Sequence, residues 1–96
     1  MVTNLKIKRS YLFFPDKKKK GDGYKPDAKL RLRVRWSGRK VDFNVGYRIK
    51  LSQWDTQTQR CRVKTTNLQK QSATLINGAI QAFETAIDNV FTAFEL

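Results

Sequence analysis

Apolar and basic residues alternate strictly along residues 28–36. A period of two is typical of a β-strand with one buried side, because successive side chains of a strand point to opposite faces. One side of this strand is therefore expected to be apolar and the other wholly basic. The apolar set is Ala28, Leu30, Leu32, Val34 and Trp36, and the basic set is Lys29, Arg31, Arg33 and Arg35.

A second strand is predicted after Ser37-Gly38, a two-residue turn signal. Apolar and polar residues alternate again over residues 40–45. If the two strands pair across this turn, every apolar residue faces another, and a shift by one residue destroys the match. Turn and pattern therefore predict the same β-hairpin. The expected pairs are Val34 with Val41, Leu32 with Phe43 and Leu30 with Val45, and on the basic side Arg35 with Lys40, Arg33 with Asp42 and Arg31 with Asn44.

A third strand is predicted near the start of the chain, over residues 3–14, with Pro15 ending it. Residues 15–27 hold two prolines, two glycines and the lysine run 17–20, which is typical of a loop. After the hairpin, residues 46–49 are expected to leave the sheet and Ser52 to cap a single turn. Residues 61–64 are a candidate for a short edge strand.

From about Ser72 the apolar spacing changes to steps of three and four, the stripe of an amphipathic helix. Such a helix can cover the apolar side of the sheet. We therefore predict an α+β fold, a three-stranded antiparallel β-sheet packed on one C-terminal α-helix. The expected stripe is Ile76, Ile80, Phe83, Ile87, Val90, Phe91 and Phe94, and Trp36, Tyr47 and Trp54 are expected in the same core.

The domain organisation follows from the length and the element pattern. Ninety-six residues suffice for one small domain. Residues 1–66 form its basic sheet and loops, and residues 67–96 its packing helix. The sequence shows no helix stop signal at its end, so we expect the domain to belong to a longer protein.

The charge of the chain is strongly positive and unevenly distributed. Twenty lysines and arginines stand against eight acidic residues, a formal net charge of +12, and all the basic residues lie in residues 1–70. Such an excess attracts polyanions, so the expected partner is DNA, RNA or an anionic membrane surface. The predicted helix lacks the basic residues of interfacial helices, and no apolar run reaches the about 20 residues of a membrane span. These features argue against a membrane.

Residues for catalysis and metal binding are mostly missing from the sequence. The chain has no histidine and a single cysteine, Cys61, so it lacks the commonest general base and cannot build a cysteine–histidine zinc site. No glycine-rich phosphate loop is present. We therefore expect a non-catalytic domain without metal, cofactor or small-molecule substrate. The lone cysteine and the missing signal-peptide pattern favour the cytoplasm.

The basic side of the hairpin is the main candidate for a binding site. Four cations in a row repel one another and do not favour folding, whereas arginine offers bidentate donors that fit guanine edges and phosphates. Sequence-specific RNA modules usually display aromatic side chains, and this side of the hairpin has none. The candidate DNA-binding residues are Lys6, Lys8, Lys29, Arg31, Arg33, Arg35, Arg39, Lys40 and Asn44. The lysine run 17–20 is either a solvated loop or a non-specific phosphate contact.

Taken together, these segments resemble the arm-type DNA-binding domain at the amino terminus of phage-integrase-like tyrosine recombinases. In that family a Lys-rich loop precedes a hairpin of apolar and basic residues, and a Gly-apolar-Lys exit, a Trp-Asp turn and a helix opening near an Asn follow. The corresponding segments here are residues 30–40, residues 46–50, Trp54-Asp55 and Ile76-Asn77. This sequence departs from the family at residues 44–46, where Asn-Val-Gly replaces the frequent Ser-Thr-Gly.

The resemblance implies a function in DNA integration or recombination of a mobile element. The sheet would enter the major groove at arm-type sites, and the catalytic Arg, His and Tyr of the recombinase would lie in a C-terminal domain. Expected partners are double-stranded DNA and, through the helix, other integrase domains or protomers. The expected location is the bacterial cytoplasm, with the nucleoid. Two alternatives stay open: an RNA-binding or ribosome-associated β-sheet module, and an assembly module that oligomerises through its helix.

Overall fold

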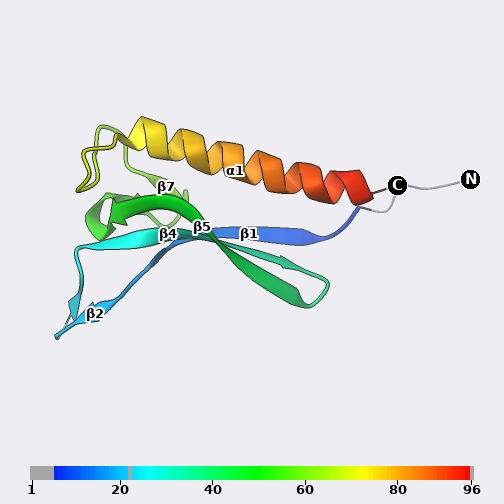
Figure 1. The fold of residues 1–96 in the computed structure, drawn as a ribbon, viewed down its shortest axis with the longest axis horizontal. Helices are drawn as coiled ribbons and strands as arrows, with labels where there is room; N and C mark the ends of the chain where they lie inside the picture. The colour runs from blue at the N-terminus through cyan, green and yellow to red at the C-terminus, as the bar shows by residue number, and fades with distance from the viewer. Residues whose placement is uncertain (1–5, 22, 96) are drawn as a thin grey trace, which may run out of the picture.

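The computed structural model describes residues 6–21 and 23–95 and shows a three-stranded antiparallel sheet with a long helix along one face (Figure 1). The sheet consists of β1 (Arg9–Asp16), β4 (Asp27–Trp36) and β5 (Arg39–Lys50), in the order β1-β4-β5. The helix is α1 (Ala73–Phe94). The predicted α+β fold class is confirmed, and the basic strand β4 lies at the centre of the sheet.

The hairpin of β4 and β5 has the predicted turn. Ser37 and Gly38 both have positive φ, 47° and 72°, as in a type I′ turn, whose twist matches that of paired strands. Most of the predicted register is confirmed as well. The observed pairs include Val34 with Val41, Leu32 with Phe43, Arg35 with Lys40, Arg33 with Asp42 and Arg31 with Asn44.

The prediction is wrong beyond Arg31, where the register shifts. Lys29 pairs with Arg48, so the expected Leu30–Val45 pair is replaced by an irregular stretch of β5. Gly46 lies in this stretch with a φ of 97°, a conformation that costs glycine less than other residues. Residues 46–49 therefore continue the sheet instead of leaving it, and β5 ends at Lys50.

The first strand also differs from its prediction. β1 begins at Arg9 and runs through Pro15 to Asp16, whereas the predicted strand covered residues 3–14, of which residues 3–5 lie outside the described residues. Pro15 does not end the strand because β1 is an edge strand, where a missing N–H is tolerated. The predicted loop after it contains a two-residue ladder of β2 (Lys19–Lys20) and β3 (Gly23–Tyr24).

The polar segment between sheet and helix is held by side-chain hydrogen bonds. A short 3-10 helix, Leu51–Gln53, follows Lys50, which takes the capping position predicted for Ser52. The Gln53 side chain, 2% exposed, accepts the N–H of Lys50 at 2.8 Å. β6 (Trp54–Asp55) pairs with β7 (Arg60–Cys61), so of the predicted edge strand 61–64 Cys61 alone is a strand residue.

The helix begins where the sequence predicted, and it contributes Ala73, Ile76, Ile80 and Phe91 to the core. The Ser72 side chain accepts the N–H of Leu75 at 3.1 Å as an N-cap. Ile76 and Ile80 are fully buried in the same core as Leu30 and Leu32 of β4. The expected aromatic residues pack on this core or belong to it, with Trp54 buried and Trp36, Tyr47 and Phe83 half-buried.

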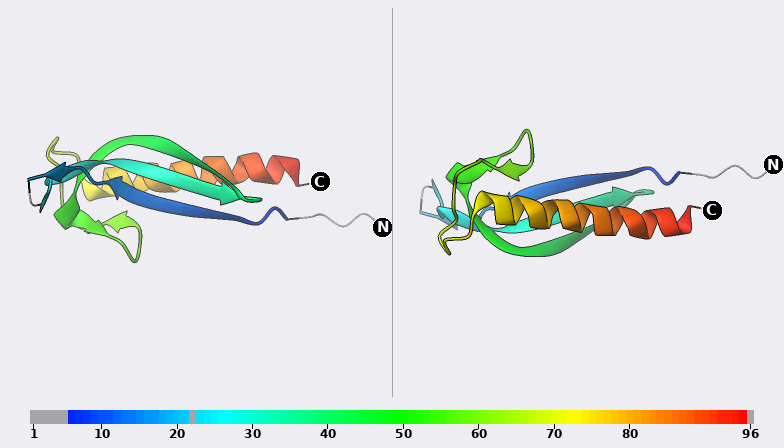
Figure 2. Two further views of the ribbon diagram at one scale, coloured as in Figure 1. Left: turned by 90° about the horizontal axis from the view of Figure 1, so that it is seen from below. Right: turned by 90° about the horizontal axis from the view of Figure 1, so that it is seen from above.

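Asn77 fixes the helix to the small β6–β7 hairpin. Its Oδ1 accepts the N–H of Cys61 at 2.8 Å, and its Nδ2 donates to the Cys61 carbonyl at 3.0 Å. Figure 2 shows α1 over one face of the sheet and this hairpin at the side. Within the described residues, no helix has both the length and the apolar character needed to cross a membrane.

Candidate nucleic-acid interface

One face of the sheet packs against α1, and we call the opposite face the outer face (Figure 1). Alternation along β4 turns Leu30, Leu32 and Val34, all at most 1% exposed, toward the helix. The side chains between them point the other way. The outer face consists of Lys29, Arg31, Arg33 and Arg35 of β4, Lys40, Asp42 and Asn44 of β5, and Ser10, Leu12, Phe14 and Asp16 of β1.

The predicted basic row therefore occupies the centre line of the outer face. Each of its residues has a neighbour on both sides: Arg33, for example, lies between Leu12 of β1 and Asp42 of β5. Sequence periodicity predicted the row and its β5 neighbours. It did not predict that Leu12 and Phe14 of β1 would lie beside the row, because the pairing partner of β1 has no turn signal to fix its register.

Arg33 is held on two sides. Its Nε and Nη2 donate to the two carboxylate oxygens of Asp42 at 2.8 and 2.9 Å. Its guanidinium carbon also lies 5.1 Å from the centre of the Phe14 ring, a cation–π contact. The hydrogen bond from Arg33 lowers the pKa of Asp42 and raises that of Arg33, so both stay charged near neutral pH.

The other cations of the row are less constrained. Nε of Arg31 lies 3.5 Å from a carboxylate oxygen of Asp16, a looser contact than the Arg33 pair. Within residues 6–21 and 23–95, no carboxylate forms an ion pair with Lys29, Arg35 or Lys40. Their charges are therefore available to a polyanion.

Asn44 lies on β5 beside Arg31 of the basic row, and part of its side chain is already hydrogen-bonded. Its Oδ1 accepts the backbone N–H of Gly46 at 2.9 Å, which helps to shape the irregular stretch of the strand. The second lone pair of Oδ1 and the amide N–H groups have no hydrogen-bond partner among the described residues.

Three of the predicted residues lie away from the centre of the outer face. Arg39 and Lys8 line an open hollow at the hairpin tip together with Arg35 and Lys40. Lys6 lines a different hollow, beside Tyr11 and Asp88 of the helix. The structure thus brings together a central set and adds Arg39 and Lys8 at the tip. Lys6 lies outside this group, in a hollow that it shares with Lys8. The central set is Lys29, Arg31, Arg33, Arg35, Lys40 and Asn44.

One family of known domains matches most of the chain. The family model of the arm DNA-binding domain matches residues 13–96, which include the second half of β1, the hairpin and the helix. The chain belongs to the arm DNA-binding domain family. No curated protein and no solved structure matches it. An arm domain binds DNA in the context of recombination and is itself non-catalytic.

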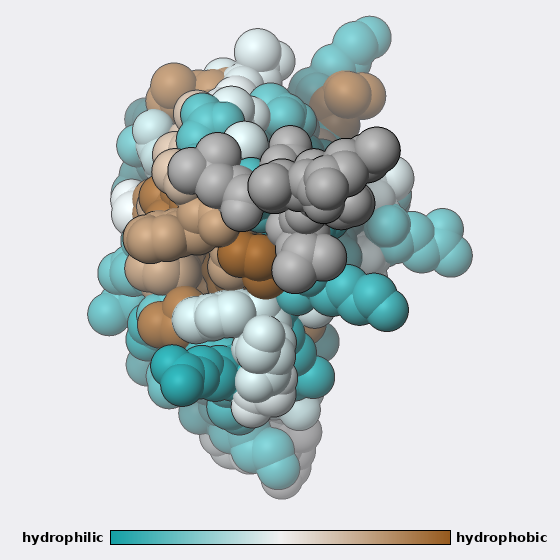
Figure 3. All heavy atoms as spheres, turned by 90° about the vertical axis from the view of Figure 1, so that its right-hand side faces the viewer, coloured by the Kyte–Doolittle hydropathy of each residue, from teal (hydrophilic) through white to brown (hydrophobic). Residues whose placement is uncertain are grey.

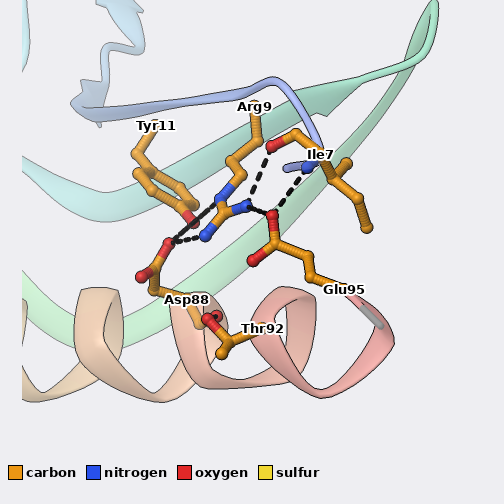
Figure 4. A network of polar contacts seen from close by, with 6 residues as sticks. All are labelled: Ile7, Arg9, Tyr11, Asp88, Thr92 and Glu95. Carbon is orange, nitrogen blue, oxygen red and sulfur yellow. Dashed lines mark hydrogen bonds and ion pairs between the residues drawn. The ribbon is translucent and has the colours of Figure 1, made fainter. Parts of the chain in front are cut away.

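Arg9 of this arm domain is a polar site that the sequence prediction missed. Its side chain, 6% exposed, bonds Asp88 at 2.7 Å and Glu95 at 2.8 Å on α1 and stacks over Phe91 (Figure 4). The Tyr11 hydroxyl donates to the same Asp88 oxygen at 2.7 Å. We call Arg9, Tyr11, Asp88 and Glu95 the Arg9 network. A signal was present, because Arg9 has the strand phase of Tyr11 and Phe13, which point inward.

The Arg9 network keeps its carboxylates ionised. Hydrogen bonds from Tyr11 and Arg9 lower the pKa of Asp88. Burial acts to raise the pKa of Glu95, but the N–H of Ile7 and the Arg9 guanidinium outweigh it and lower that pKa. Arg9, counted among the basic residues of the sheet part, therefore contributes to folding and is not part of the outer face.

The remaining chemistry of the arm domain offers little for catalysis. Burial raises the pKa of the Cys61 thiol to about 11, so it is protonated and a poor nucleophile near neutral pH. Among the described residues, no group of three His, Cys, Asp or Glu side chains lies together in a way that could hold a metal ion.

Proposed function

We propose that this arm domain binds duplex DNA sequence-specifically by placing the outer face of its sheet in the major groove. The observation that carries the proposal is the row of Lys29, Arg31, Arg33 and Arg35 along the central strand, on the face that α1 leaves uncovered. Alternate residues of a strand are about 6–7 Å apart, and a two-stranded ribbon fits the groove, about 12 Å wide. Lys40 and Asn44 widen the contact, and Arg39 and Lys8 reach the flanking backbone from the hairpin tip.

The biological setting is part of the same proposal. The DNA sites are arm-type sites beside a crossover point, and the parent protein is a tyrosine recombinase, an integrase or transposase of a mobile element, working with the nucleoid in the bacterial cytoplasm. The late part of α1 supports contacts with other domains or protomers of that recombinase. There Val90 and Phe94 are 55% and 77% exposed. Figure 3 shows apolar surface at this end of the molecule beside hydrophilic surface.

A salt titration with duplex DNA, duplex RNA and single strands tests the proposal. Duplex DNA should bind most tightly, and its affinity should fall steeply with salt, because each neutralised phosphate adds about −0.9 to the log–log slope. Preference for duplex RNA or single strands would favour an RNA-binding module. Salt-insensitive dimerisation without nucleic-acid binding would favour an assembly module.

Substitution of the row identifies the contacting face. Replacing Arg31, Arg33 and Arg35 together by Ala should leave the fold intact and largely abolish duplex binding. Each single substitution should cost about 1–3 kcal/mol if the arginine reads a base, and a phosphate contact should lower the salt slope by about 1. Lys18→Ala, in the exposed segment after β1, is the control and should have a smaller effect. A folded triple variant that binds duplex DNA like the parent would exclude the outer face.

A further inference from the structure

Arg33 and Asp42 form a partly exposed ion pair, with the two side chains 26% and 36% exposed. Exposed ion pairs of ordinary geometry contribute little to stability, whereas a bidentate arginine–carboxylate pair also fixes the orientation of the guanidinium. An acid in the middle of a face that binds a polyanion also weakens general attraction to phosphate. The pair nevertheless has short bidentate geometry, with both Asp42 oxygens used.

The direction of this pair decides which donors of Arg33 remain free. Asp42 takes the edge formed by Nε and Nη2. The Nη1 hydrogens and the second hydrogen of Nη2 then point away from the carboxylate, and no described residue accepts a hydrogen bond from Nη1. This free edge presents two parallel donors, which match the N7 and O6 acceptors of guanine in the major groove. Stacking over Phe14 limits rotation of the guanidinium plane.

The β1 neighbour of Arg33 adds an apolar contact. Leu12 lies directly opposite Arg33 in the register and is 41% exposed beside the basic row. An exposed leucine gains nothing from a phosphate. In the major groove its natural contact is the C5-methyl group of thymine.

Building on the proposed function, we propose that Arg33, clamped by Asp42 and Phe14, reads a guanine and that Leu12 contacts the methyl group of an adjacent thymine. Asp42 is a positioning residue: it touches no base and acts by fixing the orientation of Arg33. Lys29, Arg35 and Lys40, without such clamps, bind the backbone. The face thus divides into a base-reading centre and a phosphate-binding surround.

Selection from a library of random duplexes tests the role of Asp42. The parent domain should enrich a guanine at one position, and replacing that guanine should weaken binding at least about fivefold, as for other bidentate pairs. Asp42→Asn should remove most of this discrimination, and so should Arg33→Lys. The overall affinity of Asp42→Asn for random duplex should stay equal or rise, since one negative charge is lost. A merely structural role for Asp42 would instead lower affinity for all duplexes together.

Asp27→Asn is the matched control. Asp27 accepts an equally bidentate pair from Arg48, at 2.8 and 3.2 Å, at the far end of the sheet. This variant should keep the guanine preference of the parent. Equal loss of preference in both variants would overturn the assignment to Arg33.

Base analogues test the role of Leu12. Replacing the thymine beside the selected guanine by deoxyuridine removes only the methyl group and should weaken parental binding a few-fold. Leu12→Ala should bind the two duplexes equally. The inference fails, with duplex binding intact, if selection enriches no guanine, if Asp42→Asn keeps the parental preference, or if the parent ignores the methyl group. Absence of any duplex binding would instead overturn the proposed function.

Discussion

At the scale of single residues, arginine has opposite roles in β1 and β4. Arg9 is turned inward and bonds two acids of the helix, whereas Arg35 has no acidic partner among the described residues and faces solvent. The position of each arginine in the alternation of its strand distinguishes the two. Arg9 has the same phase as Phe13, which points inward, whereas Arg35 has the phase opposite to the inward-pointing Val34. The sequence therefore contained the signal for Arg9, but the prediction counted Arg9 only among the basic residues and gave it no role in the core.

The Arg9 network should make folding stability depend on acid pH. In the unfolded chain the pKa of Asp88 is about 4, the ordinary value for aspartate. In the folded chain it is lower, because Tyr11 and Arg9 donate hydrogen bonds to the carboxylate. Its contribution is thus complete above about pH 5 and is lost as pH falls through the folded value. Asp88→Asn should lower the melting temperature at pH 7 and flatten its decline between about pH 5 and pH 2.

Thermal unfolding at several pH values checks this expectation. Glu84→Gln is the control, because it removes a charge from the same helix outside the Arg9 network. In the parent, Glu84 pairs more loosely than Asp88, with an oxygen 3.5 Å from Nη2 of Arg60. The control should flatten the acid limb less than Asp88→Asn. Identical acid profiles for Asp88→Asn and the parent would show that Asp88 is not bound to Arg9 in solution.

At the scale of elements, periodicity predicted the strands and the helix that bury one apolar face. Local signals such as a proline gave wrong boundaries where the position of a strand in the assembled sheet decides them. The hairpin and α1 were predicted because one face of each must be apolar. The extension of β1 through Pro15 was missed because its edge position, which tolerates proline, is a property of the assembled sheet. The register shift near Gly46 was missed because alternation fits a regular strand equally well up to Val45. In the same way the stripe of α1 does not show which of its positions the sheet covers, since Ile80 and Phe91 are buried whereas Val90 is exposed.

The positions of the α1 stripe should therefore differ in their contribution to stability according to their burial. Ile80 is fully buried, whereas Val90 is 55% exposed, although both belong to the same stripe. Ile80→Ala should lower the free energy of unfolding by about 2–5 kcal/mol. Val90→Ala should change it by less than about 0.5 kcal/mol, as at other surface positions. Denaturant unfolding measures both, and equal losses would mean that the far end of α1 is covered in solution.

At the scale of the whole molecule, the ion pairs leave an excess of positive charge on the surface. Every acidic residue that the structure describes lies within ion-pair distance of a Lys or Arg, and those of α1 pair with Arg9 and Arg60. The sequence indicated a basic part and an acidic helix. In the fold the helix acids are used against the sheet layer, so the excess charge of +12 belongs to the exposed lysines and arginines.

Salt should consequently stabilise the free domain and weaken its DNA complex. Neighbouring cations of the row are about 6–7 Å apart, within the Debye length of about 30 Å at 0.01 M salt and of about 10 Å at 0.1 M. Added NaCl screens their repulsion, so the melting temperature should rise over this range. The affinity for duplex DNA should fall instead, because counterions released from the DNA gain less entropy when the solution already contains more salt. The variant with Arg31, Arg33 and Arg35 replaced by Ala should show both effects weakly, since it lacks most of the row. If the melting temperature instead falls with NaCl, attractive ion pairs outweigh the repulsion between cations on the surface. The outer face would then lack the unbalanced positive charge on which DNA binding is proposed to depend.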